Sequence, residues 1–120
     1  GRLAPVVESL ANEGLFAVAL ANTPAYLAAP GSVDRVLGTN PIAYALPRGN
    51  GGPPIVVDMA MAATSRAFIE LAVKSGQALP AGAAVDADGM PTTDAAAALQ
   101  GAQLAFGGLK GALLALLVEL

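Results

Sequence analysis

The clearest chemical signal lies around Lys110, in the run Gly107-Gly108-Leu109-Lys110-Gly111. The apolar stretch after this run predicts a helix that begins near Lys110. A cation at a helix N-terminus is unfavourable by roughly 0.3–1 kcal/mol. Glycines let a ligand approach the backbone, and free amides at a helix start favour anions. The run therefore predicts an anion-binding site for a cofactor phosphate or a substrate carboxylate. The alternative, a solvated loop lysine between turn glycines, is favoured by the spacing alone.

Two further polar segments lie next to expected strands. In the run Leu37-Gly38-Thr39-Asn40-Pro41, the side chains of Thr39 and Asn40 could hydrogen-bond a substrate carboxylate or a nicotinamide amide. They could equally cap their own backbone, as such residues often do in turns. Asp58 ends an expected strand, where open α/β sheets collect ligands. The same residue could instead cap a helix.

Standard nucleotide and metal motifs are absent from the sequence. No G-x-G-x-x-G follows a strand and no G-x-x-x-x-G-K-[ST] occurs, so a dinucleotide would have to be held in another way. The segment Asp86-Ala87-Asp88-Gly89 resembles a calcium loop only faintly, because Pro91 and Ala97 replace the required glycine and glutamate. We therefore expect a turn there and no metal site.

Composition narrows the possible classes of protein. At 120 residues the chain is one domain or a piece of one. Its net charge of −3, without a basic cluster, argues against nucleic-acid binding, and no apolar run reaches the ~20 residues of a membrane span. The absence of cysteine excludes disulfides and fits a cytoplasmic location. The final run, which ends at Leu120, is apolar and uncapped, so we expect an excised fragment.

The chain is 55% hydrophobic and only 12% charged, against a usual charged share of about 25%. A chain with so few charged residues is expected to expose apolar surface that another protein chain covers, which predicts a homo-oligomer.

Hydrophobic periodicity predicts alternating helices and strands. The expected helices cover residues 3–11, 60–74 and 95–99, and a last one begins near Lys110; the expected strands are 15–21, 42–46 and 55–57. The strand 15–21 is continuously apolar, which predicts cover on both faces. In the helix 60–74 the expected buried residues are Ala63, Ala67, Phe68, Leu71 and Ala72. Residues 25–38 are expected to form a long loop and residues 77–93 to be mostly loop, and Asp94 is expected to cap the helix that Gly101 ends. The pattern predicts an α/β fold with helices on a mixed sheet, distinct from the doubly wound Rossmann fold.

Several segments, taken in order, resemble one enzyme family. They are Leu37–Pro41, Asp58-Met59-Ala60, Pro91-Thr92-Thr93-Asp94 and Gly107–Gly111. The family is that of the malate/L-lactate dehydrogenase-like NAD(P)-dependent oxidoreductases, which includes sulfolactate and ureidoglycolate dehydrogenases and the piperideine and pyrroline carboxylate reductases. The resemblance runs along the whole chain. It implies that residues 1–120 are the central NAD(P)-binding portion of a larger dehydrogenase, truncated at both ends.

The resemblance also implies roles for individual residues. With NADP or NAD as the cofactor, hydride would pass between NAD(P)H and C2 of a 2-oxo acid or cyclic imine. The family's proton-exchanging histidine would lie upstream of this chain, which has no histidine. Thr39 and Asn40 would face the substrate. The residues implied to bind the cofactor are Asn22, Thr23, Asp58, Met59, Ala60 and Lys110. The choice between NAD and NADP stays open; Arg35, Arg48 and Arg66 could meet a 2′-phosphate.

The sequence departs from the family pattern in ways that bear on activity. Met61-Ala62 replaces a Thr-Ser pair, Ala67-Phe68 replaces Gly-Lys, and Ala112-Leu113 replaces Tyr-Gly after Lys110-Gly111. A positioned acid–base group typically supplies about 10²–10⁴ in rate, so a chain without the histidine should be nearly silent. The remaining proton-donor candidates are Tyr26, Tyr44 and Asp58. The alternative function is a catalytically silent scaffold or oligomerisation module that keeps the fold.

Overall fold

The computed structural model describes residues 2–120, which form two compact units. Unit 1 contains residues 2–21 and Pro41–Met59, and unit 2 contains Asn22–Asn40 and Ala60–Leu120. The chain thus passes between the units three times, whereas its length predicted one domain or a piece of one. None of the helices in the described residues is both long and apolar enough to cross a membrane.

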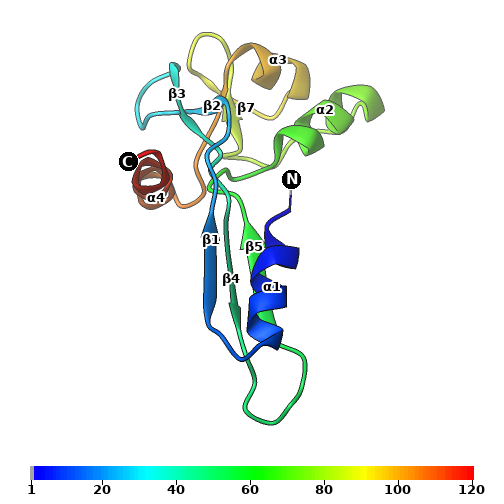
Figure 1. Ribbon diagram of the computed structural model, residues 1–120. Helices are drawn as coiled ribbons and strands as arrows, with labels where there is room; N and C mark the ends of the chain where they lie inside the picture. The colour runs from blue at the N-terminus through cyan, green and yellow to red at the C-terminus, as the bar shows by residue number, and fades with distance from the viewer. Residues whose placement is uncertain (1) are drawn as a thin grey trace. The chain divides into compact units, whose positions relative to one another are not determined.

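Unit 1 is a three-stranded antiparallel sheet with one helix packed on it (Figure 1). Its elements are α1 (Ala4–Asn12), β1 (Ala17–Leu20), β4 (Ile42–Leu46) and β5 (Ile55–Met59), and the strand order is β1-β4-β5. Pro5 lies in the first turn of α1, where its missing amide proton costs nothing. The expected helix and the strands after residue 41 are confirmed.

The core of unit 1 lies between α1 and one face of the sheet. Val7 and Ala11 of α1 pack on Ala17, Ala43 and Ala45, which alternate along β1 and β4. The expectation that the first strand is covered on both faces is wrong. Val18 and Leu20, on the opposite face of β1, are 53% and 50% exposed, because α1 covers only one side of this sheet.

Unit 2 contains a mixed five-stranded sheet in the order β3-β2-β8-β6-β7. The strands are β2 (Ala25–Ala28), β3 (Arg35–Gly38), β6 (Ala84–Val85), β7 (Pro91–Thr92) and β8 (Ala102–Gln103). Only the β2–β8 pairing is parallel. The long loop expected at 25–38 is wrong, because that segment holds β2 and β3. The segment 77–93 is mostly loop, as expected, and its only strands are the two-residue β6 and β7. These strands are two to four residues long, too short for a clear alternation of apolar and polar residues.

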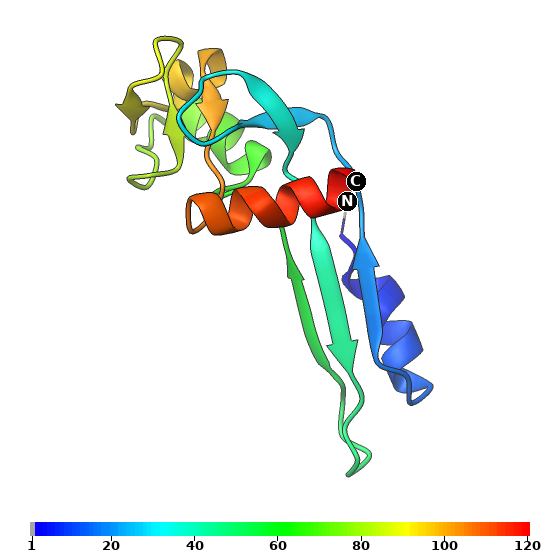
Figure 2. The same ribbon diagram turned by 90° about the vertical axis from the view of Figure 1, so that its left-hand side faces the viewer.

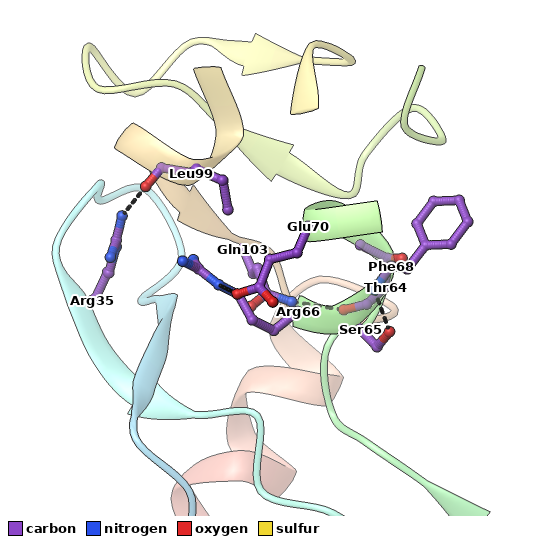
Figure 3. Close-up of polar contacts among 8 residues, drawn as sticks. All are labelled: Arg35, Thr64, Ser65, Arg66, Phe68, Glu70, Leu99 and Gln103. Atoms are coloured by element: carbon purple, nitrogen blue, oxygen red, sulfur yellow. Dashed lines mark hydrogen bonds and ion pairs between the residues drawn. The ribbon is translucent and has the colours of Figure 1, made fainter. Parts of the chain in front are cut away.

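The helices of unit 2 are α2 (Arg66–Ser75), α3 (Ala95–Gln100) and α4 (Leu109–Glu119). The predicted start of α2 at Ala60 is wrong. Residues 61–63 instead pair with residues 104–106, where Ala63 N donates to Leu104 O at 2.9 Å and Phe106 N donates to Met61 O at 2.9 Å. The helix begins only after Ser65, whose hydroxyl accepts a hydrogen bond from Phe68 N at 3.0 Å (Figure 3).

The buried face of α2 agrees with the prediction only in part. Ala72 is buried as expected and Phe68 is partly buried, whereas Ala63, Ala67 and Leu71 are exposed. Ile69 is buried instead, because it packs with Ala72 against α3 and residues 79–84. The cap of α3 is confirmed: the Asp94 carboxylate accepts from Ala96 N at 2.8 Å and Ala97 N at 3.3 Å. The predicted mixed α/β class with helices packed on a mixed sheet is likewise confirmed.

Two polar side chains fix the sheet of unit 2 to its helices (Figure 3). At the end of α3, the Arg35 guanidinium donates to Leu99 O at 2.8 Å and to Gly101 O at 2.6 Å. Near the start of α2, the buried Gln103 amide donates to Thr64 O at 2.7 Å. These bonds satisfy backbone carbonyls that regular secondary structure leaves free.

Candidate functional site

Asn40 is the centre of a polar cluster in unit 2. Its side chain is fully buried, and it is the one non-glycine residue with a positive φ, 29°, among residues 2–120. Asparagine tolerates this left-handed region better than most residues. Its Oδ1 accepts from Thr23 N at 3.1 Å, while its Nδ2 donates to Ala115 O at 2.9 Å and to Glu119 Oε1 at 2.9 Å. Both amide protons of Asn40 are therefore used inside the protein.

Glu119, in the last turn of α4, accepts hydrogen bonds from three residues. Its Oε1 accepts from Gly38 N and from Asn40 Nδ2, each at 2.9 Å, and its Oε2 accepts from Asn22 Nδ2 at 3.0 Å. The hydrogen bonds from Asn40, Gly38 and Asn22 lower the pKa of the Glu119 carboxyl, and partial desolvation opposes them. The cluster therefore holds a carboxylate anion.

Thr23 and Thr39 form a pair of hydroxyls beside Asn40. Their Oγ1 atoms are 3.1 Å apart, and Asn40 N donates to Thr23 Oγ1 at 3.3 Å. If the Thr23 hydroxyl donates to Thr39, the Thr39 proton is free to bind an anion, since each hydroxyl carries one donor and two lone pairs. Thr39 is only partly buried. The carbonyl of Thr39 accepts from Met61 N at 2.7 Å, so this turn is also joined to the segment after Ala60.

The start of α4 is open. Gly107 and Gly108 have φ values of 58° and 59°, in the left-handed region that favours glycine, and no side chain caps the helix. The first amides of a helix have no partner within it. A pocket of about 400 Å³ adjoins this turn, and its lining includes Gly107, Gly108, Phe106 and Ala112 but not Lys110. The turn thus supplies amides and space for a ligand.

The Lys110 side chain is exposed, and the part of the chain that the structure describes offers it no hydrogen bond or ion pair. Gly111, next to it, packs so closely on the carbonyl of Phe106 that a Cβ would overlap that oxygen. This contact fixes the backbone from which Lys110 projects.

Asp58 lies in unit 1, where its carboxylate has a structural role. Its Oδ2 accepts from Leu3 N and Ala4 N, each at 2.8 Å, and so caps the start of α1. Sequence reasoning had left open a helix cap at this residue, and the helix is α1, distant in sequence. Met59 is 40% exposed.

The predicted site residues thus divide between the units. Unit 2 brings Asn22, Thr23, Thr39 and Asn40 together and also contains Ala60 and Lys110, whereas Asp58 and Met59 belong to unit 1.

Sequence reasoning missed Glu119, which joins this cluster to α4. The available signal was a carboxylate at the end of an otherwise apolar helix, a position that the helix dipole disfavours.

The arginines considered for a 2′-phosphate in unit 2 have local partners. Arg35 binds carbonyls, and Arg66 pairs with Glu70 at 3.0 Å and lies 4.9 Å from the Tyr26 ring centre. Within residues 2–120, acidic side chains form no cluster that could hold a metal ion.

Comparison with known proteins decides the family. The family model described as malate/L-lactate dehydrogenase matches residues 1–120. The chain belongs to the malate/L-lactate dehydrogenase family. Among curated members, it is similar to a Delta(1)-pyrroline-2-carboxylate reductase of Burkholderia ambifaria, with 51% identity over 116 residues that cover 97% of this chain and 34% of the reductase. It is also 46% identical to a (2R)-3-sulfolactate dehydrogenase (NADP(+)) of Chromohalobacter salexigens, over 95% of this chain and 34% of that enzyme.

A solved family structure has the same fold. The delta1-piperideine-2-carboxylate reductase of Pseudomonas syringae superposes with a TM-score of 0.94 at 42% identity, covering 99% of this chain and 36% of that protein. The chain therefore spans about a third of the length of the family members it matches.

Proposed function

We propose that this chain is the central cofactor-binding portion of an NAD(P)-dependent reductase of this family, with a cyclic imine carboxylate or a 2-oxo acid as substrate. The similarity to pyrroline-2-carboxylate reductases and to a sulfolactate dehydrogenase supports a small carboxylate substrate. Bound NAD(P)H would supply the hydride. We further propose that the proton donor is the family's histidine, which lies outside this chain, and that the fold holds the dinucleotide without a Rossmann motif.

The observation that carries the proposal is the open N-terminus of α4. Its free amides, the positive-φ glycines Gly107 and Gly108 and the ammonium of Lys110 all favour an anion. The adjoining pocket of about 400 Å³ lies within the range of ~300–1,000 Å³ that is usual for small-molecule sites. A phosphate of the cofactor is the anion that we assign to this place.

Other residues have proposed roles around this anchor. Thr39 would donate its hydroxyl proton to the substrate carboxylate, while Asn40 would shape the turn and Thr23 would orient the hydroxyl of Thr39. The family pattern adds Asn22, Asp58, Met59 and Ala60 as proposed cofactor contacts. Because the Asp58 carboxylate is engaged by α1, we propose that Asp58 acts chiefly by fixing the backbone of its segment.

Titration of the purified chain with NADPH and NADH, followed by fluorescence, tests this proposal. We expect Lys110→Ala to weaken binding by about tenfold, the effect of losing one charge-assisted contact of ~1.4 kcal/mol. Lys74→Ala is the matched control, since Lys74 is an exposed lysine in the last turn of α2. Equal affinities of both variants and the wild-type chain for NADPH and NADH would count against the proposed anion-binding site at the start of α4. The ratio of NADPH to NADH affinity decides the cofactor.

The second candidate is a scaffold or oligomerisation module without turnover. The exposed apolar surface of α4 favours it: Leu109, Leu113 and Leu117 are 55–63% exposed. Tight self-association of a chain that binds neither NADPH nor NADH would support this function over the first.

A further inference from the structure

Glu119 joins two parts of unit 2 that are far apart in sequence. The first is the end of α4, and the second is the turn formed by Gly38, Thr39 and Asn40, hereafter the 38–40 turn. The bond from Asn40 Nδ2 to Glu119 Oε1 spans 79 residues, and that from Gly38 N spans 81. Figure 2 shows α4 side-on, running past β3, the strand that ends at Gly38.

Without its hydrogen-bond partners, the Glu119 carboxylate would destabilise the end of α4. An anion in the last turn of a helix opposes the helix dipole. Glu119 nevertheless lies there, with three N–H donors directed at its two oxygens. Two of these donors belong to the 38–40 turn, so the carboxylate holds the turn by both its main chain and a side chain.

The 38–40 turn has little freedom to find another arrangement. A Cβ on Gly38 would overlap the Asn40 side chain and would lie 2.5 Å from the Thr23 carbonyl oxygen. Asn40 is fully buried in a left-handed conformation, and Thr39 lies between these two residues. A contact that fixes Gly38 and Asn40 therefore also fixes the direction in which the Thr39 hydroxyl points.

We propose that Glu119 is a positioning residue that holds the 38–40 turn in the geometry that presents the Thr39 hydroxyl to the substrate carboxylate. The inference rests on the proposed function for the role of Thr39. The fixing of the turn by Glu119 can be tested in the chain without any ligand. The proposed role of Glu119 is indirect: its oxygens accept from Gly38, Asn40 and Asn22, and it acts on the substrate through the 38–40 turn.

The ligand-free test is hydrogen exchange of the Gly38 amide, measured by ¹H–¹⁵N NMR on the whole chain. We expect exchange at Gly38 to become about tenfold faster in Glu119→Gln, with shift changes confined to the 38–40 turn and α4. Glu8→Gln, on the exposed face of α1, is the control for removal of one negative charge. Asn22→Ala removes the outer bond to Glu119 and a bond to Val118 O, but neither bond to the 38–40 turn, and should leave Gly38 protected. Unchanged exchange at Gly38 in Glu119→Gln would overturn the inference.

The test of positioning uses L-proline, the reduced form of pyrroline-2-carboxylate, as the carboxylate probe in the presence of NADPH. We expect Glu119→Gln to weaken L-proline binding by about tenfold and NADPH binding by less than about twofold. Faster exchange at Gly38 with unchanged L-proline affinity would make Glu119 a structural contact only and would overturn the positioning role. If the wild-type chain binds no L-proline, the proposed function and the substrate part of the inference fail together, whereas faster Gly38 exchange would still support the fixing of the turn.

Discussion

Asn40 shows how one buried side chain can shape the 38–40 turn. Three of its hydrogen-bonding positions are satisfied by the main chain and by Glu119, and its backbone adopts a conformation that few residues tolerate. An amide is required here, because an aspartate would lose both donors and would face the Glu119 carboxylate at close range. The amide of Asn40 therefore fixes the conformation of the 38–40 turn through contacts inside the protein.

The lowered pKa of Glu119 predicts a pH dependence of stability. A carboxyl whose pKa is lower in the folded state stabilises the fold fully above its unfolded value, here 4.5, and loses that contribution as pH falls through the folded value. We expect the wild-type chain to be more stable than Glu119→Gln at neutral pH, and this difference to shrink as pH falls below 4.5. Urea unfolding of both proteins between about pH 3 and pH 7 measures it. A difference that stays constant with pH would contradict the prediction.

At the scale of elements, α4 carries a charge at each end, and both charges oppose the helix dipole. Lys110 lies in the first turn and Glu119 in the last, about 13–14 Å apart at 1.5 Å per residue. Glu119 has partners that offset this cost, whereas none of the residues the structure describes pairs with Lys110. The helix thus links the 38–40 turn to the anion-binding site that we propose at Lys110.

The cap of α2 allows a test of the revised helix boundary. Ser65 accepts from Phe68 N at 3.0 Å, so Ser65→Ala should destabilise the fold by about 1 kcal/mol, and Ser65→Asp should retain most of the stability. Ser9→Ala, on the exposed side of α1, is the control. Chemical denaturation measures the free energy of unfolding. If Ser65→Ala matches the control, the helix does not begin at this residue.

For the whole molecule, the central question is whether the chain lacks only a proton donor. The chain has no histidine, the Tyr26 ring lies against the Arg66 guanidinium, the Asp58 carboxylate caps α1, and Tyr44 is half-buried in β4. With Thr39, Lys110 and the pocket beside α4 as the proposed binding groups, we expect this chain alone to bind its ligands with little turnover.

If the proton donor is the upstream histidine, as proposed, joining the chain to the upstream segment of its relatives should give reduction of pyrroline-2-carboxylate or a small 2-oxo acid by NADPH. We expect a rise in rate of about 10²–10⁴, the usual contribution of a positioned acid–base group. A histidine-to-alanine variant of the same fusion is the control. A fusion that binds NADPH and stays inactive would favour the scaffold function.

The sequence alone determined the family, the mixed α/β class, the helix before Gly14, the strands after Pro41 and the cap at Asp94. These depend on local patterns: residue order in motifs, hydrophobic periodicity and the short reach of a capping side chain. Local patterns also misled, since the apolar residues 61–63 suit a helix but pair instead with residues 104–106.

Only the tertiary structure decided how Glu119, Asn40 and Thr23 come together, that Asp58 caps α1, and that the chain forms two units. The hydrogen bonds that create these arrangements join residues 17 to 81 positions apart. Their partners are chosen by the packing of the chain, because a carboxylate or an amide has the same local signature whether it faces water, a helix start or another side chain.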